Sequence, residues 1–106
     1  MKIEFEITNN QLSFLNEAIA YHLVDPVQAT SKENKSFIYL MFDIANKLLK
    51  KAIEKRGVKK AFKLTLKFYE AVAVHQFLLI FIDQGTTREQ KRVTREILAI
   101  INQKIV

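Results

Sequence analysis

Lysine and arginine side chains gather in one stretch of the sequence, from Lys47 to Lys67. This window holds nine of the chain's 17 Lys and Arg residues but one of its 11 Asp and Glu residues, so its formal charge is +8. Ammonium groups bind phosphates as point charges, whereas base edges are read mainly by Arg, Asn or Gln. Because eight of the nine cations are lysines, we expect an anionic partner to be bound with little sequence preference and a steep dependence on salt.

Eight of these residues are the predicted anion-binding side chains, with a nucleic-acid backbone as the first candidate partner and an acidic protein as the second. They are Lys47, Lys51, Lys55, Arg56, Lys59, Lys60, Lys63 and Lys67. Three of them, Lys59, Lys60 and Lys63, fall where a helix is expected to start, and the helix dipole disfavours cations there. That placement favours a functional reason for the charge. The alternative is a solvated face whose charges only keep the protein soluble.

A second basic group, from Arg88 to Arg95, is interpreted differently. Its cations alternate with carboxylates at helical pairing distances, as Arg92 does with Glu96. This pattern is typical of an exposed helix face held by salt bridges, which we expect here. The residues concerned are Arg88, Lys91, Arg92 and Arg95, with Glu89 and Glu96 between them.

Residues that support catalysis or metal binding do not occur in the combinations that such chemistry requires. The chain has no Cys, and its few Ser residues lack a neighbouring His and acid pattern. Neither His22 nor His75 follows a Glu at the Glu-x-x-His spacing of metal sites in helical bundles. Gly57 and Gly85 are the only glycines, so no glycine-rich loop can hold a nucleotide. We therefore expect no catalytic residue, no metal and no cofactor.

The hydrophobic pattern predicts one domain, residues 1–106, that begins with a strand and a helix. Residues 2–7 alternate between charged and apolar side chains, which predicts a half-buried strand. Thr8 and Gln11 have the spacing of a capping box, and apolar residues then recur at helical intervals. A first helix is therefore expected over residues 9–24.

Three further helices are expected. The second begins at Ser36 as its N-cap and ends at Gly57, a residue suited to the position after a helix. The third covers residues 58–83. The fourth begins after Thr86 as its N-cap, and Glu89 completes the capping-box spacing. Short connections between them predict antiparallel neighbours.

Residues 61–68 fit two interpretations. Their apolar side chains alternate with polar ones, as in a strand. Helix is preferred because no turn signal separates this segment from the apolar run after it and because three lysines lie four positions apart. These are Lys59, Lys63 and Lys67.

Together the elements predict an all-α fold, an antiparallel bundle of four helices preceded by one short N-terminal strand. A lone strand leaves backbone groups unpaired, so we expect it to pair with the same strand of a second protomer. The second helix also has an apolar face too wide for a small monomer to cover. A homo-oligomer, dimer or higher, is predicted, with an interface of Ile3, Phe5, Ile7, Phe37, Ile38 and Phe42. The alternative is a monomer whose strand folds onto its own helices.

No membrane span is expected. The most apolar run, residues 71–82, is shorter than the roughly 20 residues that cross a bilayer, and the N-terminal residues lack the apolar core of a signal peptide. The absence of Cys suits a cytoplasmic location. We therefore expect a small non-catalytic oligomeric binding module that presents its Lys-rich tip to an anion. The alternative is a structural, assembly or inhibitor protein that acts through its apolar helix faces.

Overall fold

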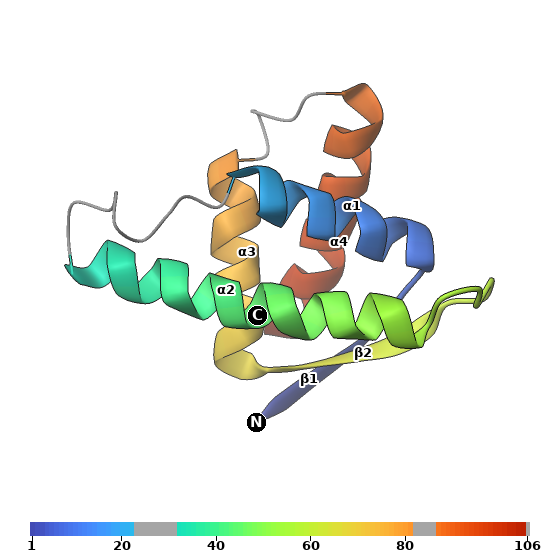
Figure 1. Cartoon of the computed structure of the whole chain (residues 1–106), viewed down its shortest axis with the longest axis horizontal. Coiled ribbons are helices and arrows are strands. Elements are labelled where there is room, and N and C mark those ends of the chain that lie inside the picture. The colour runs from blue at the N-terminus through green and yellow to red at the C-terminus, as the bar shows by residue number, and fades with distance from the viewer. Residues whose placement is uncertain (23–31, 82–86, 106) are drawn as a thin grey trace.

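A two-stranded sheet and four helices make up the fold in the computed structural model, which describes residues 1–22, 32–81 and 87–105 (Figure 1). The predicted N-terminal strand and the four helices are present, and a second strand is added to them. In chain order the elements are β1 (Lys2–Ile7), α1 (Asn9–His22), α2 (Lys32–Glu54), β2 (Phe62–Lys67), α3 (Phe68–Phe81) and α4 (Arg88–Ile105).

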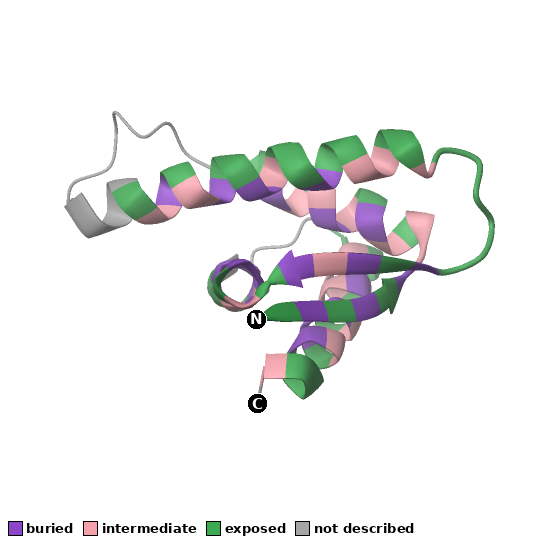
Figure 2. Cartoon of the chain, turned by 90° about the horizontal axis from the view of Figure 1, so that it is seen from below, coloured by how far each residue is buried: buried purple, intermediate pink, exposed green. Residues whose placement is uncertain are grey.

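The two strands pair with each other in antiparallel orientation within one chain. Ile3 lies opposite Leu66, and Phe5 lies opposite Leu64. Their apolar side chains share one face and are buried, while the alternate residues are exposed except Thr65, which is half-buried, as the banding of both strands in Figure 2 shows. The prediction that β1 pairs between protomers is therefore wrong, because β2 satisfies its backbone groups from the same chain.

The helix predicted over residues 58–83 is also wrong in its first part, since residues 62–67 form β2 and α3 begins only at Phe68. The spacing of Lys59, Lys63 and Lys67 did not discriminate between the two structures. Four positions are one helical turn, but four is also an even number, which returns a strand to the same face. The alternation of apolar side chains was the informative signal.

Interface residues predicted on β1 lie instead in the chain's own core. Ile3, Phe5 and Ile7 are 7%, 4% and 1% exposed, and they pack with residues of β2 and all four helices. From α2, Ile38 is buried and Phe37 is half-buried against the core, whereas Phe42 remains 39% exposed. Burial of β1 therefore removes half of the predicted interface from the surface.

The start of α1 confirms the predicted capping box. The backbone N–H of Thr8 donates to Oε1 of Gln11 at 3.0 Å, and the backbone N–H of Gln11 donates to Oγ1 of Thr8 at 3.1 Å. These bonds satisfy donors that a helix leaves unpaired in its first turn. The predicted last two residues of this helix lie outside the described residues.

One other predicted cap differs from the structure, and another lies outside the described residues. Ser36 lies inside α2, which begins at Lys32. The predicted cap Thr86 lies outside the described residues, and the described cap of α4 is Thr87, whose Oγ1 accepts from the backbone N–H of Gln90 at 3.0 Å.

The helices do not form a simple antiparallel bundle. α1 and α2 run side by side, and α3 and α4 cross behind them at a steep angle (Figure 1). Because β2 connects α2 to α3, the chain returns along the sheet before α3 starts, and α3 is not held as the antiparallel neighbour of α2. No helix among the described residues is long and apolar enough to cross a membrane.

Candidate anion-binding surface

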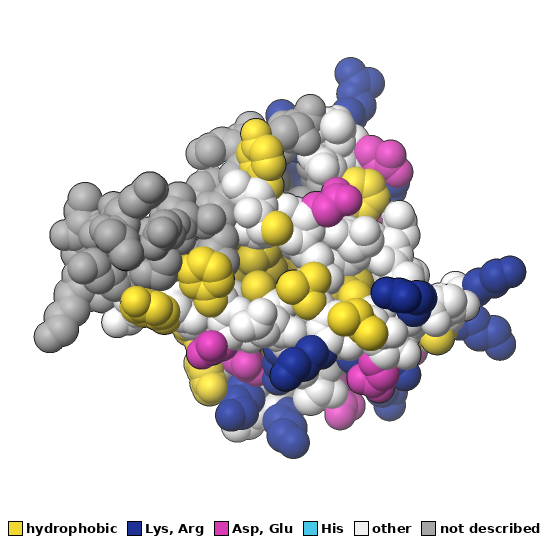
Figure 3. All heavy atoms as spheres, viewed as in Figure 1, with side chains coloured by type: hydrophobic (Ala, Val, Ile, Leu, Met, Phe, Trp, Pro, Cys, Tyr) yellow, Lys and Arg dark blue, Asp and Glu magenta, His cyan; other side chains and the backbone are white. Residues whose placement is uncertain are grey.

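The connection between α2 and β2, residues 55–61, projects from one end of the molecule (Figure 1). We call it the basic loop, because four of its seven residues are cations and none is acidic. Residues 56–61 are exposed and Lys55 is half-buried. Lys and Arg side chains extend into solvent at this end (Figure 3). The cations of the loop are Lys55, Arg56, Lys59 and Lys60.

The backbone of the basic loop is held in a defined conformation. Gly57 has φ +83°, a left-handed conformation that suits glycine after a helix, and the N–H of Val58 donates to the carbonyl of Lys55 at 3.0 Å. From α1, the side-chain amide of Asn9 donates to the carbonyls of Lys55 and Val58, both at 2.7 Å. The carbonyl of Lys55 thus accepts from both Val58 and Asn9, and the carbonyl of Val58 accepts from Asn9. The loop is clamped to the body of the protein at its base.

Three of the predicted anion-binding lysines lie away from the basic loop and have acidic neighbours. The Lys47 ammonium forms an ion pair with Oε1 of Glu70 at 2.9 Å, and the backbone N–H of Lys67 donates to the same oxygen at 2.8 Å. Lys63 lies opposite Glu6 in the sheet register. Their positive charge is therefore partly balanced within the chain, and they are the weaker members of the predicted set.

Glu70 is the one acidic residue among those that the structure describes as buried. Its burial raises its pKa, but the hydrogen bonds from Lys67 and Lys47 and the charges of these two lysines outweigh burial. The net effect holds the pKa of Glu70 below its ordinary value of 4.5. Glu70 is also the third residue of α3, where it accepts from the residue just before the helix, as in half of a capping box.

The structure removes the helix-dipole reason for Lys59, Lys60 and Lys63. No helix starts at residue 58, so Lys59 and Lys60 lie in a loop and Lys63 lies in β2, where no helix dipole opposes them. Lys51 lies in the last turn of α2, where the dipole favours a cation. The dipole is therefore no longer a reason to assign these lysines a function. What still favours a function is that Lys59 and Lys60 are exposed and lie on a loop with a fixed base.

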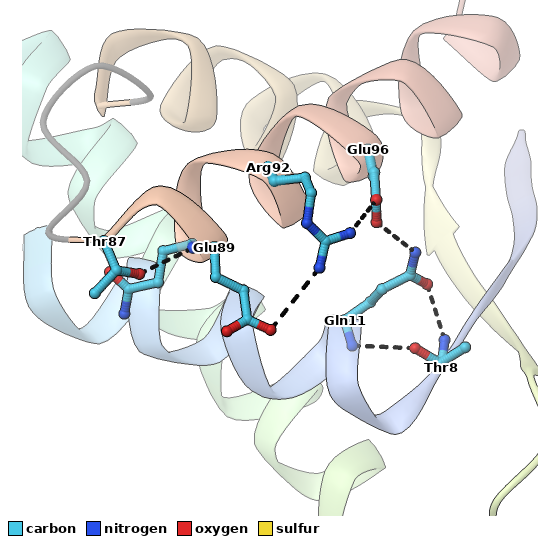
Figure 4. A network of polar contacts seen from close by, with 7 residues as sticks. Thr8, Gln11, Thr87, Glu89, Arg92 and Glu96 are labelled. Atoms are coloured by element: carbon cyan, nitrogen blue, oxygen red, sulfur yellow. Dashed lines mark hydrogen bonds and ion pairs between the residues drawn. The ribbon is translucent and has the colours of Figure 1, made fainter.

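The second basic group lies on α4 and contains the predicted salt bridges. Arg92 pairs with Glu96 at 2.8 Å and with Glu89 at 3.8 Å. Gln11 joins the network from α1, because its Nε2 donates to Oε2 of Glu96 at 3.5 Å (Figure 4). Arg92 is therefore engaged within α4, and Glu96 links α4 to the start of α1.

Two of the residues that shape this surface were not singled out from the sequence. Asn9 has no local signal, because its partners lie 46 and 49 positions further along the chain. Glu70 could have been found only if a helix start at Phe68 had been predicted, since it stands three positions after Lys67. Among the described residues, no group of three or more His, Asp or Glu side chains is placed to hold a metal ion.

Comparison with known proteins gives no family. No protein-family model matches the sequence, and neither a curated protein nor a solved structure matches it. The function is therefore inferred from the residues of this chain.

Proposed function

We propose that this protein is a non-catalytic binding module whose basic loop contacts the backbone of a nucleic acid. The observation that carries the proposal is four exposed or half-exposed cations on a seven-residue loop that Asn9 fixes at its base. A fixed loop loses less conformational entropy on binding than a free one, so its charges contribute more of their attraction to affinity.

Lysine chemistry supports a phosphate backbone rather than a base-specific site. Three of the four loop cations are Lys, and the one Arg, Arg56, follows the end of α2. An ammonium group attracts any phosphate but does not make the paired hydrogen bonds that identify a base. Stacking is limited, because Phe62 beside the loop is 8% exposed and its ring lies 5.8 Å from the Lys55 ammonium. Binding should therefore depend on charge more than on sequence.

The proposal predicts how steeply the binding affinity should fall as the salt concentration rises. If the four loop cations each neutralise one phosphate of duplex DNA, log K should fall with log salt with a slope of about −3.6. A fourfold rise in salt then weakens binding by about a hundredfold. Fluorescence anisotropy of labelled duplex DNA and RNA of unrelated sequences, measured across a salt series, would give this slope.

A pair of matched variants locates the site. Lys59→Glu with Lys60→Glu should abolish most of the affinity at low salt and reduce the salt slope. Arg88→Glu with Lys91→Glu changes the net charge by the same amount on α4 and should weaken binding far less. Absence of binding to any nucleic acid at low salt would contradict the proposal, and equal losses in both variants would show that only net charge matters.

A second candidate function is assembly through apolar helix faces. It is favoured by one specific observation, namely that four of the large exposed hydrophobic side chains of the described residues lie on α2. In this alternative the basic loop is a solvated surface, and the charge-reversal variants retain function. These apolar side chains are Tyr39, Phe42, Leu49 and Ile53.

A further inference from the structure

Exposed apolar side chains on α2 follow a heptad pattern. Tyr39, Phe42, Leu49 and Ile53 recur at intervals of three, seven and four residues. With Asn46 they occupy successive a and d positions of α2, the pattern of a helix that packs lengthwise against another helix. The apolar part of the stripe runs for about 21 Å along α2, at 1.5 Å per residue.

This stripe is separate from the side of α2 that packs into the core. Met41, Ile44 and Leu48 are 0% exposed, whereas Tyr39, Phe42, Leu49 and Ile53 are 60%, 39%, 49% and 64% exposed. A row of hydrophobic side chains is visible along α2 on the face shown in Figure 3. Within the described residues, nothing covers this row, so it is free to pack against a partner.

The flanking residues make the stripe complementary to a second, antiparallel copy of itself. In antiparallel coiled pairs, a positions of one helix meet d positions of the other, and e positions meet e positions. That register sets Phe42 against Ile53 of the second copy. It also sets Asp43, which is exposed, beside the exposed Lys50 of the second copy, and the same contact forms twice by symmetry.

Small residues lie on the other flank. In the same register Ala45 meets Ala52 of the second copy; both side chains are small, and each is also half-buried against the chain's own core. Ala52 and Leu49 also line a shallow groove between α1 and α2, so the stripe continues into a hollow that can receive the second helix. The same register sets Asn46 against Leu49 of the second copy, so the charge pair of Asp43 and Lys50 is the feature that selects this arrangement.

A parallel pair is disfavoured by charge. It would set Lys50 against Ala45 of the second copy, with no charge partner, and bring the two basic loops together at one end. Asn46 could then bond with Asn46 of the second copy, which is the one feature that suits a parallel pair. A single such bond is weaker than the repulsion between two clusters of at least four cations. The antiparallel pair separates the loops to opposite ends.

We infer that the protein forms a symmetric dimer in which the α2 helices of two copies pack antiparallel through this stripe. The apolar stripe is one helix face about 21 Å long, so the interface belongs to the small, weak end of protein–protein contacts. This inference does not depend on nucleic-acid binding.

Analytical ultracentrifugation over a concentration series tests the dimer. The unmodified chain should show a reversible monomer–dimer equilibrium. Ile53→Glu should raise the dissociation constant by about tenfold or more, because a carboxylate would be buried at the interface. Ile80→Glu is the matched control, because Ile53 and Ile80 are similarly exposed, at 64% and 59%, and each is the second-last residue of its helix. It should leave the equilibrium unchanged, and circular dichroism should show both variants folded.

A charge exchange tests the orientation. Asp43→Lys and Lys50→Asp should each weaken the dimer, and the double variant should restore it, because the two residues meet across an antiparallel interface. A chain that stays monomeric up to about 1 mM, the limit of a weak complex, would overturn the inference. So would equal losses in Ile53→Glu and Ile80→Glu, or a double variant no better than the single ones.

Discussion

The side-chain amide of Asn9 donates a hydrogen bond to the backbone carbonyl of Lys55, 46 positions further along the chain, at 2.7 Å. The same amide reaches the carbonyl of Val58 at 2.7 Å. Through these two bonds the first turn of α1 fixes the end of α2 and the start of the basic loop. The conformation of the candidate site is thus controlled by a residue that carries no charge.

Replacing Asn9 should loosen the basic loop. Asn9→Ala removes both bonds and should lower the free energy of unfolding by about 1 kcal/mol, because one of them is partly buried. Urea denaturation would measure the loss. Amide hydrogen exchange in residues 55–58 should rise more than elsewhere. Asn10→Ala, at the exposed neighbouring position, should change neither quantity, and similar effects at both positions would contradict the clamp.

Acidification should weaken the contact between α3 and α2 through Glu70. The pKa of Glu70 is lowered in the folded chain from its ordinary value of 4.5, so the stability it contributes is present above that value and is lost as the pH falls through the folded pKa. At neutral pH, Glu70→Gln should lower the free energy of unfolding by about 1–3 kcal/mol. Denaturation curves at several pH values should show this gap closing in acid. A gap independent of pH would show that the charge of Glu70 is irrelevant.

The sheet should contribute to stability through its buried face. Leu66 is 0% exposed, so Leu66→Ala should lower the free energy of unfolding by about 2–5 kcal/mol. Leu79, which is 53% exposed on α3, offers the same substitution at the surface. Leu79→Ala should stay within about 0.5 kcal/mol of the unmodified chain. Thermal unfolding followed by circular dichroism would compare the two, and equal losses would argue against a buried β2.

The turn after α2 should require glycine for its backbone conformation and not for space. A Cβ at Gly57 would meet no atom within 4 Å, but φ is +83°. Gly57→Ala should therefore lower the free energy of unfolding by about 1–2 kcal/mol. Gly57→Asn should lower it less, since Asn tolerates this conformation. The order of the two variants in urea denaturation is the measurement, and a larger loss for Asn would point to crowding instead.

Local patterns were predictable from the sequence, and distant pairings were not. The Thr8–Gln11 cap and the alternation of β1 depend on neighbours a few positions apart, and both are confirmed. The sequence also indicated that β1 needs a partner. It did not identify residues 62–67 as that partner: their alternation was visible, but the pairing joins positions 55 to 65 apart and leaves no local signal.

For the candidate site too, the local pattern was predictable and the contacts between distant residues were not. The excess of positive charge between Lys47 and Lys67 is a property of composition and could be read directly. Which cations remain without a carboxylate nearby depends on contacts across the fold, such as Lys47 with Glu70. The prediction that treated all eight residues alike is therefore refined, with the basic loop as its centre.

Pairing of β1 with β2 has a consequence for how the chain is made. Lys2 meets Lys67, so β1 leaves the ribosome 65 residues before the last residue of its partner strand. At about 5–20 residues per second, this is a wait of roughly 3–13 s. Throughout that time the strand has an unpaired edge and an uncovered apolar face, which can associate with other chains. Its alternate side chains Lys2, Glu4 and Glu6 are charged, and they keep the nascent strand soluble until its partner is synthesised.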